Sequence, residues 1–130
     1  MRSYKILNNQ EIFYKGFSIV PIRDIDKFDI MNWRNEQIYH LRQSEKLNKK
    51  LKNKYFKDVI SPLFTSEFPP QILFSFMENN KCIGYGGLVH INWADKNAEI
   101  SFIMNTKLEN DSFVSNWSIF LILIEKIAFD

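Results

Sequence analysis

The alternation of apolar and polar positions predicts short strands separated by two helical stretches and followed by a third. Runs with strand character are residues 17–23 (FSIVPIR), 72–78 (ILFSFME), 81–92 (KCIGYGGLVHIN) and 98–104 (AEISFIM). Two further segments, residues 4–7 and 10–14, are expected to pair around Asn8-Asn9, because this dipeptide is turn-prone. Pro21 indicates an edge position or a bulge in its strand. Asn79-Asn80 predicts a tight turn between two of the strands.

Apolar residues at helical spacing predict the helices. The first begins after Asp24, a candidate cap, and has an apolar face of Ile25, Phe28, Met31, Ile38 and Leu41. The second covers residues 48–64, with an apolar stripe of Leu47, Leu51, Tyr55, Val59 and Leu63. The third is strongly apolar and is expected to run from about Ser112 to the end of the chain.

The order of these elements is strand, helix, helix, three strands with short turns, and helix. Short turns require antiparallel neighbours, since parallel strands need a long crossover. The sequence therefore predicts an α+β fold, a mainly antiparallel sheet flanked by helices, in one domain spanning residues 1–130.

Composition narrows the functional classes. A net charge of +2 is too small to favour nucleic acid or an anionic membrane surface as partner. The single cysteine, Cys82, excludes a disulfide framework and a cysteine-based metal site, and it favours a cytoplasmic setting. No apolar run is long enough for a membrane span. A lysine-rich run on the second helix could attract phosphates, although a solvated helical face is the more common explanation: Lys46, Lys49, Lys50, Lys52, Lys54 and Lys57.

Three of the four glycines, Gly84, Gly86 and Gly87, lie in the strand of residues 81–92. Glycine weakens a strand because it costs backbone entropy and has no side chain to pack. Two explanations are open. The glycines permit a twisted, bulged hairpin, or they permit close approach of a ligand or a neighbouring backbone.

Candidate chemistry lies on the following strand. Alternation places Glu99, Ser101 and Ile103 on one face and Ala98, Ile100, Phe102 and Met104 on the other. Glu99 is either a general base facing a groove or a solvated charge on an open face. If the loop is residues 93–96, His90 lies opposite Glu99, and if Asn97 also belongs to the loop, the two side chains point to opposite faces. We expect the four-residue loop.

The motifs MNWRNEQIYHLR (residues 31–42), KCIGYGGLVHIN (81–92) and NAEISFIM (97–104) resemble the GNAT superfamily of N-acetyltransferases. Trp33-Arg34-Asn35, followed by Ile-x-x-x-Arg, is similar to members that acetylate amino groups of nucleotide-linked sugars. The pattern also resembles members that acetylate ribosomal-protein N-termini or aminoglycosides. The resemblance spans residues 17–130, and it implies the N-terminal portion of an acyl-CoA N-acyltransferase-like fold.

The resemblance implies a donor, an acceptor and roles for individual residues. Acetyl-CoA would donate the acetyl group to a small-molecule amine, with Glu99 as base and His90 nearby. Pantetheine would enter an opening between residues 87–91 and 100–104 and bind the backbone of Phe102, Ile103 and Met104, while a helix start at Ser112 would offer N–H groups to phosphate. The acceptor site would be formed by Trp33, Arg34 and Asn35. The glycine-rich phosphate loop of the superfamily is absent from residues 105–117, and no residue is assigned as general acid.

An alternative hypothesis is a non-catalytic fragment of the same fold that self-associates. An exposed sheet edge favours pairing with a second chain, so this alternative predicts a homodimer without turnover.

Overall fold

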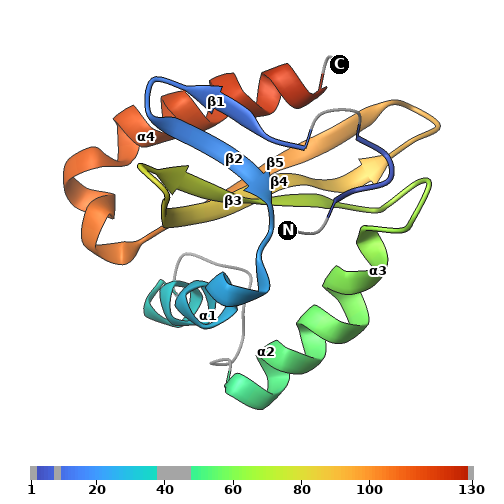
Figure 1. The fold of residues 1–130 in the computed structure, drawn as a ribbon, viewed down its shortest axis with the longest axis horizontal. Coiled ribbons are helices and arrows are strands. Elements are labelled where there is room, and N and C mark those ends of the chain that lie inside the picture. The colour runs from blue at the N-terminus through green and yellow to red at the C-terminus, as the bar shows by residue number, and fades with distance from the viewer. Residues whose placement is uncertain (1–2, 8–9, 38–47, 129–130) are drawn as a thin grey trace.

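The computed structural model of the chain describes residues 3–7, 10–37 and 48–128, with the side chains of residues 107–114 and 128 outside that description. Five strands form one antiparallel sheet in the order of the chain (Figure 1). They are β1 (Ile12–Tyr14), β2 (Phe17–Pro21), β3 (Ile72–Glu78), β4 (Lys81–Asn92) and β5 (Asn97–Met104). The predicted Asn79-Asn80 turn is confirmed, with φ of 49° and 68° at the two asparagines.

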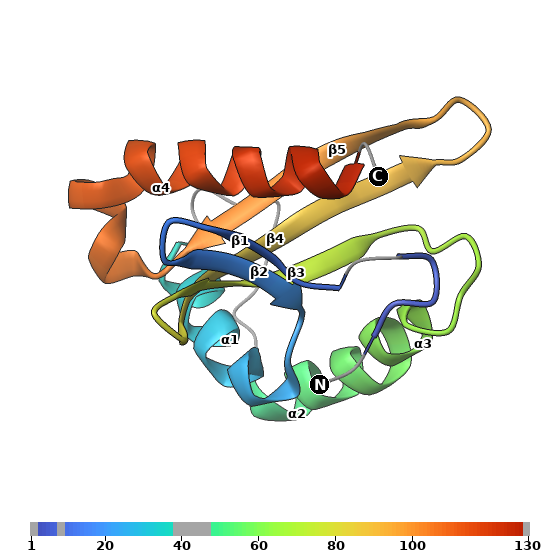
Figure 2. The same cartoon turned by 45° about the horizontal axis from the view of Figure 1, so that its top comes forward.

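Helices cover both faces of the sheet (Figure 2). One face carries the 3₁₀ turn η1 (Asp24–Asp26) and α1 (Lys27–Glu36), and then α2 (Lys49–Tyr55), the π-helical turn η3 (Phe56–Ile60) and α3 (Ser61–Leu63). The other face carries α4 (Thr106–Ala128). The predicted α+β class, an antiparallel sheet flanked by helices, is confirmed. No helix within the described residues is both long enough and apolar enough to cross a bilayer.

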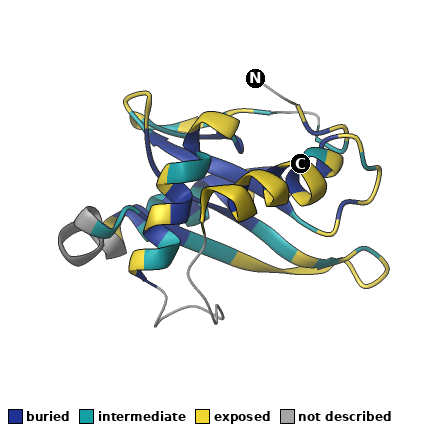
Figure 3. Cartoon of the chain, turned by 90° about the horizontal axis from the view of Figure 1, so that it is seen from below, coloured by how far each residue is buried: buried dark blue, intermediate teal, exposed yellow. Residues whose placement is uncertain are grey.

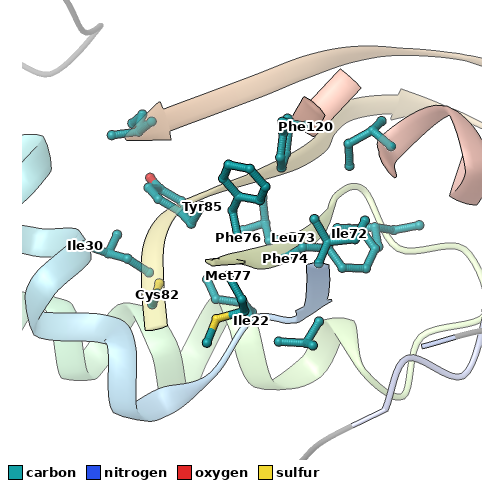
Figure 4. Packing of buried hydrophobic residues seen from close by; sticks show 14 of the residues in the cluster. Ile22, Ile30, Ile72, Leu73, Phe74, Phe76, Met77, Cys82, Tyr85 and Phe120 are labelled. Atoms are coloured by element: carbon teal, nitrogen blue, oxygen red, sulfur yellow. The ribbon is translucent and has the colours of Figure 1, made fainter. Parts of the chain in front are cut away.

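The hydrophobic core lies on both faces of the sheet, between the sheet and α4 on one side and between the sheet and α1 to α3 on the other. The central strands are largely buried in Figure 3. Phe76 packs edge-on against Phe120 of α4, with ring centroids 5.5 Å apart (Figure 4). Phe102 lies 4.6 Å from the Phe120 ring, so both strands hold the same helix. These aromatic contacts fix β5 against α4 and leave its opposite face to α1 and α2.

The N-terminal prediction is wrong. Residues 4–7 form no strand, and β1 pairs with β2 through the Lys15-Gly16 turn instead. Tyr4 is buried in the core, where its hydroxyl donates to the Leu73 carbonyl at 2.6 Å and accepts from the Leu73 N–H at 3.0 Å. A polar aromatic side chain that reaches a buried backbone edge gains more from this contact than from a marginal hairpin.

The start of α1 also differs from expectation. Asp24 lies inside η1, and the N-cap residues of η1 and α1 are Arg23 and Asp26, neither of which makes a side-chain cap hydrogen bond. The neighbouring Asp26 is buried, accepts two hydrogen bonds from Arg23 at 2.7 and 2.9 Å, and accepts one from Ser75 Oγ at 2.9 Å. This network ties the helix start to β3. Ile38 and Leu41 lie outside the described residues.

The second helical stretch covers the expected residues, but its buried face is rotated by one position. Lys52, Phe56, Ile60 and Leu63 are buried, whereas Leu51, Tyr55 and Val59 are 47%, 39% and 39% exposed. The predicted stripe therefore faces outward or into a cavity, except at Leu63. Leu47 lies outside the described residues.

Candidate functional site

The two faces of β5 separate as the alternation predicted. Phe102 packs under α4, where its ring centroid lies 5.3 Å from that of Trp117. Ser101 lies on the opposite face and lines a cavity together with side chains of α1 and α2. Glu99 and Ile103 line a second cavity beside it. One face of β5 therefore belongs to the core under α4, while the other bears the candidate site.

The first cavity has a volume of about 430 Å³ and lies between the sheet and the two helices. Leu51, Phe56 and Leu73 contribute to its apolar wall. Its polar lining residues are Arg34, Lys52, Tyr55, Gln71, Tyr85 and Ser101. Two of these side chains are cations, and no carboxylate of the described residues lines this cavity.

Arg34 and Tyr85 are joined directly across this cavity. The Arg34 Nη1 donates a hydrogen bond of 2.6 Å to the Tyr85 hydroxyl oxygen. Burial raises the pKa of Tyr85, and the charge and hydrogen bond of Arg34 offset only part of that rise. The phenol is therefore neutral at pH 7, and its own O–H hydrogen can donate to a bound molecule.

Lys52 is the most unusual residue of this cavity, because it is charged and only 4% exposed. Its Nζ lies 5.3, 5.4 and 6.0 Å from the ring centroids of Tyr55, Phe56 and Tyr85. Burial, and then the charge of Arg34, lowers the pKa of Lys52 to about 8. The aromatic rings compensate part of the desolvation of the ammonium group.

The second cavity, of about 580 Å³, adjoins the first and shares Arg34, Gln71, Val89 and Ser101 with it. His90 and Glu99 lie here, with His90 Nε2 at 4.0 Å from Glu99 Oε2. Both side chains are mostly exposed, at 71% and 66%. The second cavity therefore contains a carboxylate and an imidazole, those of Glu99 and His90. The first cavity contains two cations, Lys52 and Arg34, and Arg34 also lines the second.

The four-residue loop of residues 93–96 is confirmed, since Asn92 pairs with Asn97. The cross-strand partner of Glu99 is nevertheless Val89 and not His90, because the register shifts by one residue between Val89 and Asn92. His90 adopts a positive φ of 50° at this irregularity. A bulge of this kind re-aims a side chain, and it brings the His90 ring near Glu99 by a route that alternation alone does not give.

The expected opening between residues 87–91 and 100–104 is wrong. β4 and β5 pair continuously from Gly84 with Met104 to Val89 with Glu99. A Cβ on Gly84 would lie 2.7 Å from the Ile103 carbonyl oxygen, and one on Gly86 would lie 2.9 Å from the Phe102 Cα. The glycines therefore serve close approach of a neighbouring backbone, one of the two explanations that the sequence left open.

Among the described residues, no strand pairs with the outer edge of β5, the last strand in the sheet order. The Asn105 N–H donates to the Ile83 carbonyl at 2.7 Å. Because hydrogen-bonded pairs alternate along an antiparallel ladder, the backbone of Ile103 faces β4, and the backbone groups of Phe102 and Met104 face away from it. The outward Met104 carbonyl accepts a 2.8 Å hydrogen bond from Gln37 Nε2.

The remaining predicted residues are not all near this edge. Trp33 is buried in the hydrophobic core, and neither Trp33 nor Asn35 lines either cavity. The prediction that a helix begins near Ser112 is wrong, because α4 begins at Thr106 and contains Ser112 in its second turn. The side chain of Ser112 lies outside the described residues. The free N–H groups of this helix therefore belong to its first turn, directly after β5.

Sequence reasoning missed Lys52, Tyr85 and Gln71. The signal for Lys52 was present, since it lies four residues before Phe56 and eight before Ile60, on the face that the structure buries. Lys52 was counted with the solvated lysines of its helix, of which Lys49, Lys50, Lys54 and Lys57 are exposed. Lys46 lies outside the described residues.

Comparison with known proteins assigns the chain to a family. The family model of the acetyltransferase (GNAT) domain matches residues 19–130, so the chain belongs to this family. Membership implies transfer of an acetyl group from acetyl-CoA to an amine. No curated protein matches the chain.

Two solved structures share the fold. A probable acetyltransferase of the GNAT family from Chromobacterium violaceum superposes with a TM-score of 0.70 and 14% identity, over 98% of this chain and 67% of that one. The ribosomal-protein-S5-alanine acetyltransferase of Vibrio fischeri superposes with a TM-score of 0.59 and 11% identity, over 91% of this chain and 68% of that one. At these identities the likeness shows the fold alone.

Proposed function

We propose that this chain transfers the acetyl group of acetyl-CoA to the amine of a small acceptor, an amino sugar linked to a nucleotide. The observation that carries the proposal is the pair of adjoining cavities on the face of β4 and β5 that α1 and α2 cover. One contains Glu99, the other contains Lys52, and Arg34 lines both. An amine placed at Glu99 thus has a cationic region beside it for the rest of the acceptor.

Glu99 is the proposed general base. An amine acceptor is protonated at pH 7, and its ammonium proton must leave before the nitrogen can attack the thioester. The Glu99 carboxylate would accept this proton, and His90, 4.0 Å away, would stabilise the carboxylate or pass the proton to solvent. Arg34, whose guanidinium Tyr85 orients, would bind acceptor oxygens.

The edge of β5 fits the donor. Phe102 directs its backbone N–H and carbonyl outward, and Met104 directs its N–H outward while its carbonyl accepts from Gln37. An extended chain containing amides can pair with such an edge like an added strand. The first turn of α4 follows at once and supplies N–H groups toward an anion. Acetyl-CoA would supply the acetyl group there, beside the cavity that contains Glu99. Neither the structure nor the comparisons support the alternative of a non-catalytic fragment.

A thiol-release assay with acetyl-CoA tests this proposal. The acceptor panel contains nucleoside diphosphate-linked amino sugars, free amino sugars and a peptide with an N-terminal alanine. We expect the nucleotide-linked sugars to be the best acceptors, and Glu99→Gln to lower kcat/KM by about 100-fold or more. Glu67→Gln is the matched control, because Glu67 is 71% exposed and lies outside both cavities.

Three results would contradict the proposal. If acetyl-CoA neither binds in calorimetry nor raises the melting temperature, it is not the acetyl donor of this protein. If the enzyme acetylates the alanine peptide faster than the nucleotide-linked sugars, the acceptor is a peptide and not an amino sugar. If Glu99→Gln and the wild type have equal kcat/KM values, Glu99 is not the general base.

A further inference from the structure

The ammonium group of Lys52 belongs to the lining of the first cavity, where no carboxylate of the described residues lies to pair with it. Lys52 is 4% exposed. In the part of the chain that the structure describes, its ammonium group contacts the rings of Tyr55, Phe56 and Tyr85 and makes no ion pair or side-chain hydrogen bond. Its charged neighbour across the cavity is Arg34, whose positive charge repels it. A buried cation beside another cation opposes folding, so the position calls for a compensating ligand.

The rest of the cavity wall has the donors that an anion needs. Tyr85 accepts a hydrogen bond from Arg34, which leaves its own O–H hydrogen to donate. Tyr55 likewise accepts from Gln71 Nε2 at 3.3 Å, and Ser101 adds a third hydroxyl. These hydrogen-bond donors line the same cavity as Lys52, and no carboxylate among the described lining residues competes with a bound anion.

Apolar surface accompanies these donors. Leu51 is 47% exposed and Tyr55 is 39% exposed, although both line the cavity. The helix has an irregular π-type turn, η3, directly after Tyr55, a feature common at functional sites. The cavity therefore suits a molecule that combines an anionic group with a flat or apolar part.

We propose that the first cavity binds an anionic group of the acceptor, a phosphate or a carboxylate, and that Lys52 is the residue that selects for it. This inference rests on the proposed function for the identity of the ligand as acceptor. It narrows the acceptor to amines that carry a negative charge on the side away from Glu99. Lys52 is then a specificity-determining residue, distinct from the base.

Calorimetry with simple probes tests the anion site without turnover. The probes are inorganic phosphate, benzoate and benzyl alcohol, the last as the neutral counterpart of benzoate. We expect both anions to bind the wild type and Lys52→Arg, and Lys52→Met to weaken both by about 10- to 100-fold, since a hydrogen-bonded charge is lost. Benzyl alcohol should bind all proteins alike. Lys50→Met is the matched control, because Lys50 is an exposed lysine of the same helix.

The outcomes separate this inference from the proposed function. Anions that bind Lys52→Met as tightly as the wild type overturn the inference, as does a wild type that binds acetyl-CoA but neither anion. If anions bind through Lys52 and acetyl-CoA does not bind, the transferase proposal fails and the anion site stands. Melting temperatures check folding, and Lys52→Gln, which removes the charge but keeps a polar end, replaces Lys52→Met if the latter does not fold.

Discussion

Replacing Gly86 with alanine tests how closely β4 and β5 must approach. An added Cβ would lie 2.9 Å from the Phe102 Cα and closer still to the Ser101 carbonyl oxygen, both backbone atoms that no rotamer change can move. The two strands would have to separate by about 1 Å, and overpacking of this kind costs about 3 kcal/mol at the upper end of its range. Unfolding entropy is about 2.1 cal/mol/K per residue, so a chain of 130 residues should melt about 11 °C lower.

The same displacement should reach the site, because Glu99, Ser101 and Ile103 are on the strand that moves. A shift of about 1 Å in a catalytic group can cost about 100-fold, which we expect in kcat/KM measured well below the melting temperature. Differential scanning fluorimetry and the thiol-release assay give the two numbers.

Gly16→Ala is the comparison for Gly86→Ala. Gly16 has a φ of 81°, but a Cβ there meets only Asn79 Oδ1, at 3.4 Å. We expect about 1 kcal/mol of strain, a loss of about 4 °C and no change in activity. If Gly86→Ala melts within 2 °C (about 0.5 kcal/mol) of the wild type, the argument from close backbone approach is refuted.

Three further predictions concern buried polar groups. Lys52 has a pKa lowered from 10.5 to about 8, so the unfolded chain binds more protons between these values, and stability should rise with pH across that window by about 3 kcal/mol in total. Urea titrations at pH 7.5 and 9 should show this rise in the free energy of unfolding in the wild type and not in Lys52→Met. The same change between the two pH values in both proteins would contradict the prediction. Asp26→Asn should cost about 2 kcal/mol by weakening the buried contacts with Arg23 and Ser75, measured as a shift of the urea midpoint, and an unchanged midpoint refutes this reasoning. Tyr85→Phe should raise the acceptor KM about tenfold at constant kcat, because the Tyr85 hydroxyl orients Arg34; a fall in kcat alone contradicts that role.

The central strands and their turns were predictable because their signals are local. β3 has the predicted bounds, and both hairpin loops around β4 have the predicted lengths. Alternation placed Glu99 and Ser101 on one face of β5 and Phe102 on the other, and the ring contacts of Phe102 with Trp117 and Phe120 of α4 agree. A period of two along a strand depends on backbone geometry alone, and it needs no knowledge of the partner.

The second helix shows where periodicity fails. Leu51, Tyr55 and Val59 are as regularly spaced as Lys52, Phe56 and Ile60, and a ranking by hydrophobicity selects the first set. The structure buries the second set, including a lysine. Because the helix borders a cavity, Leu51 and Tyr55 remain accessible for a ligand, and only the packing of α1, α2 and the sheet shows which side of the helix faces the core.

The α+β class, the antiparallel order of the central strands and the face of β5 on which Glu99 lies could be predicted from the amino-acid sequence, since these follow from residue periodicity and turn chemistry. The folded chain was needed to show that Tyr4 hydrogen-bonds to Leu73, that a bulge at His90 pairs Val89 with Glu99, and that Lys52 shares a cavity with Arg34 and Tyr85. These contacts join residues far apart in the chain, or depend on one extra residue in a ladder. The free energy that stabilises these contacts depends on neighbouring residues, and the local pattern of apolar and polar residues does not specify those neighbours.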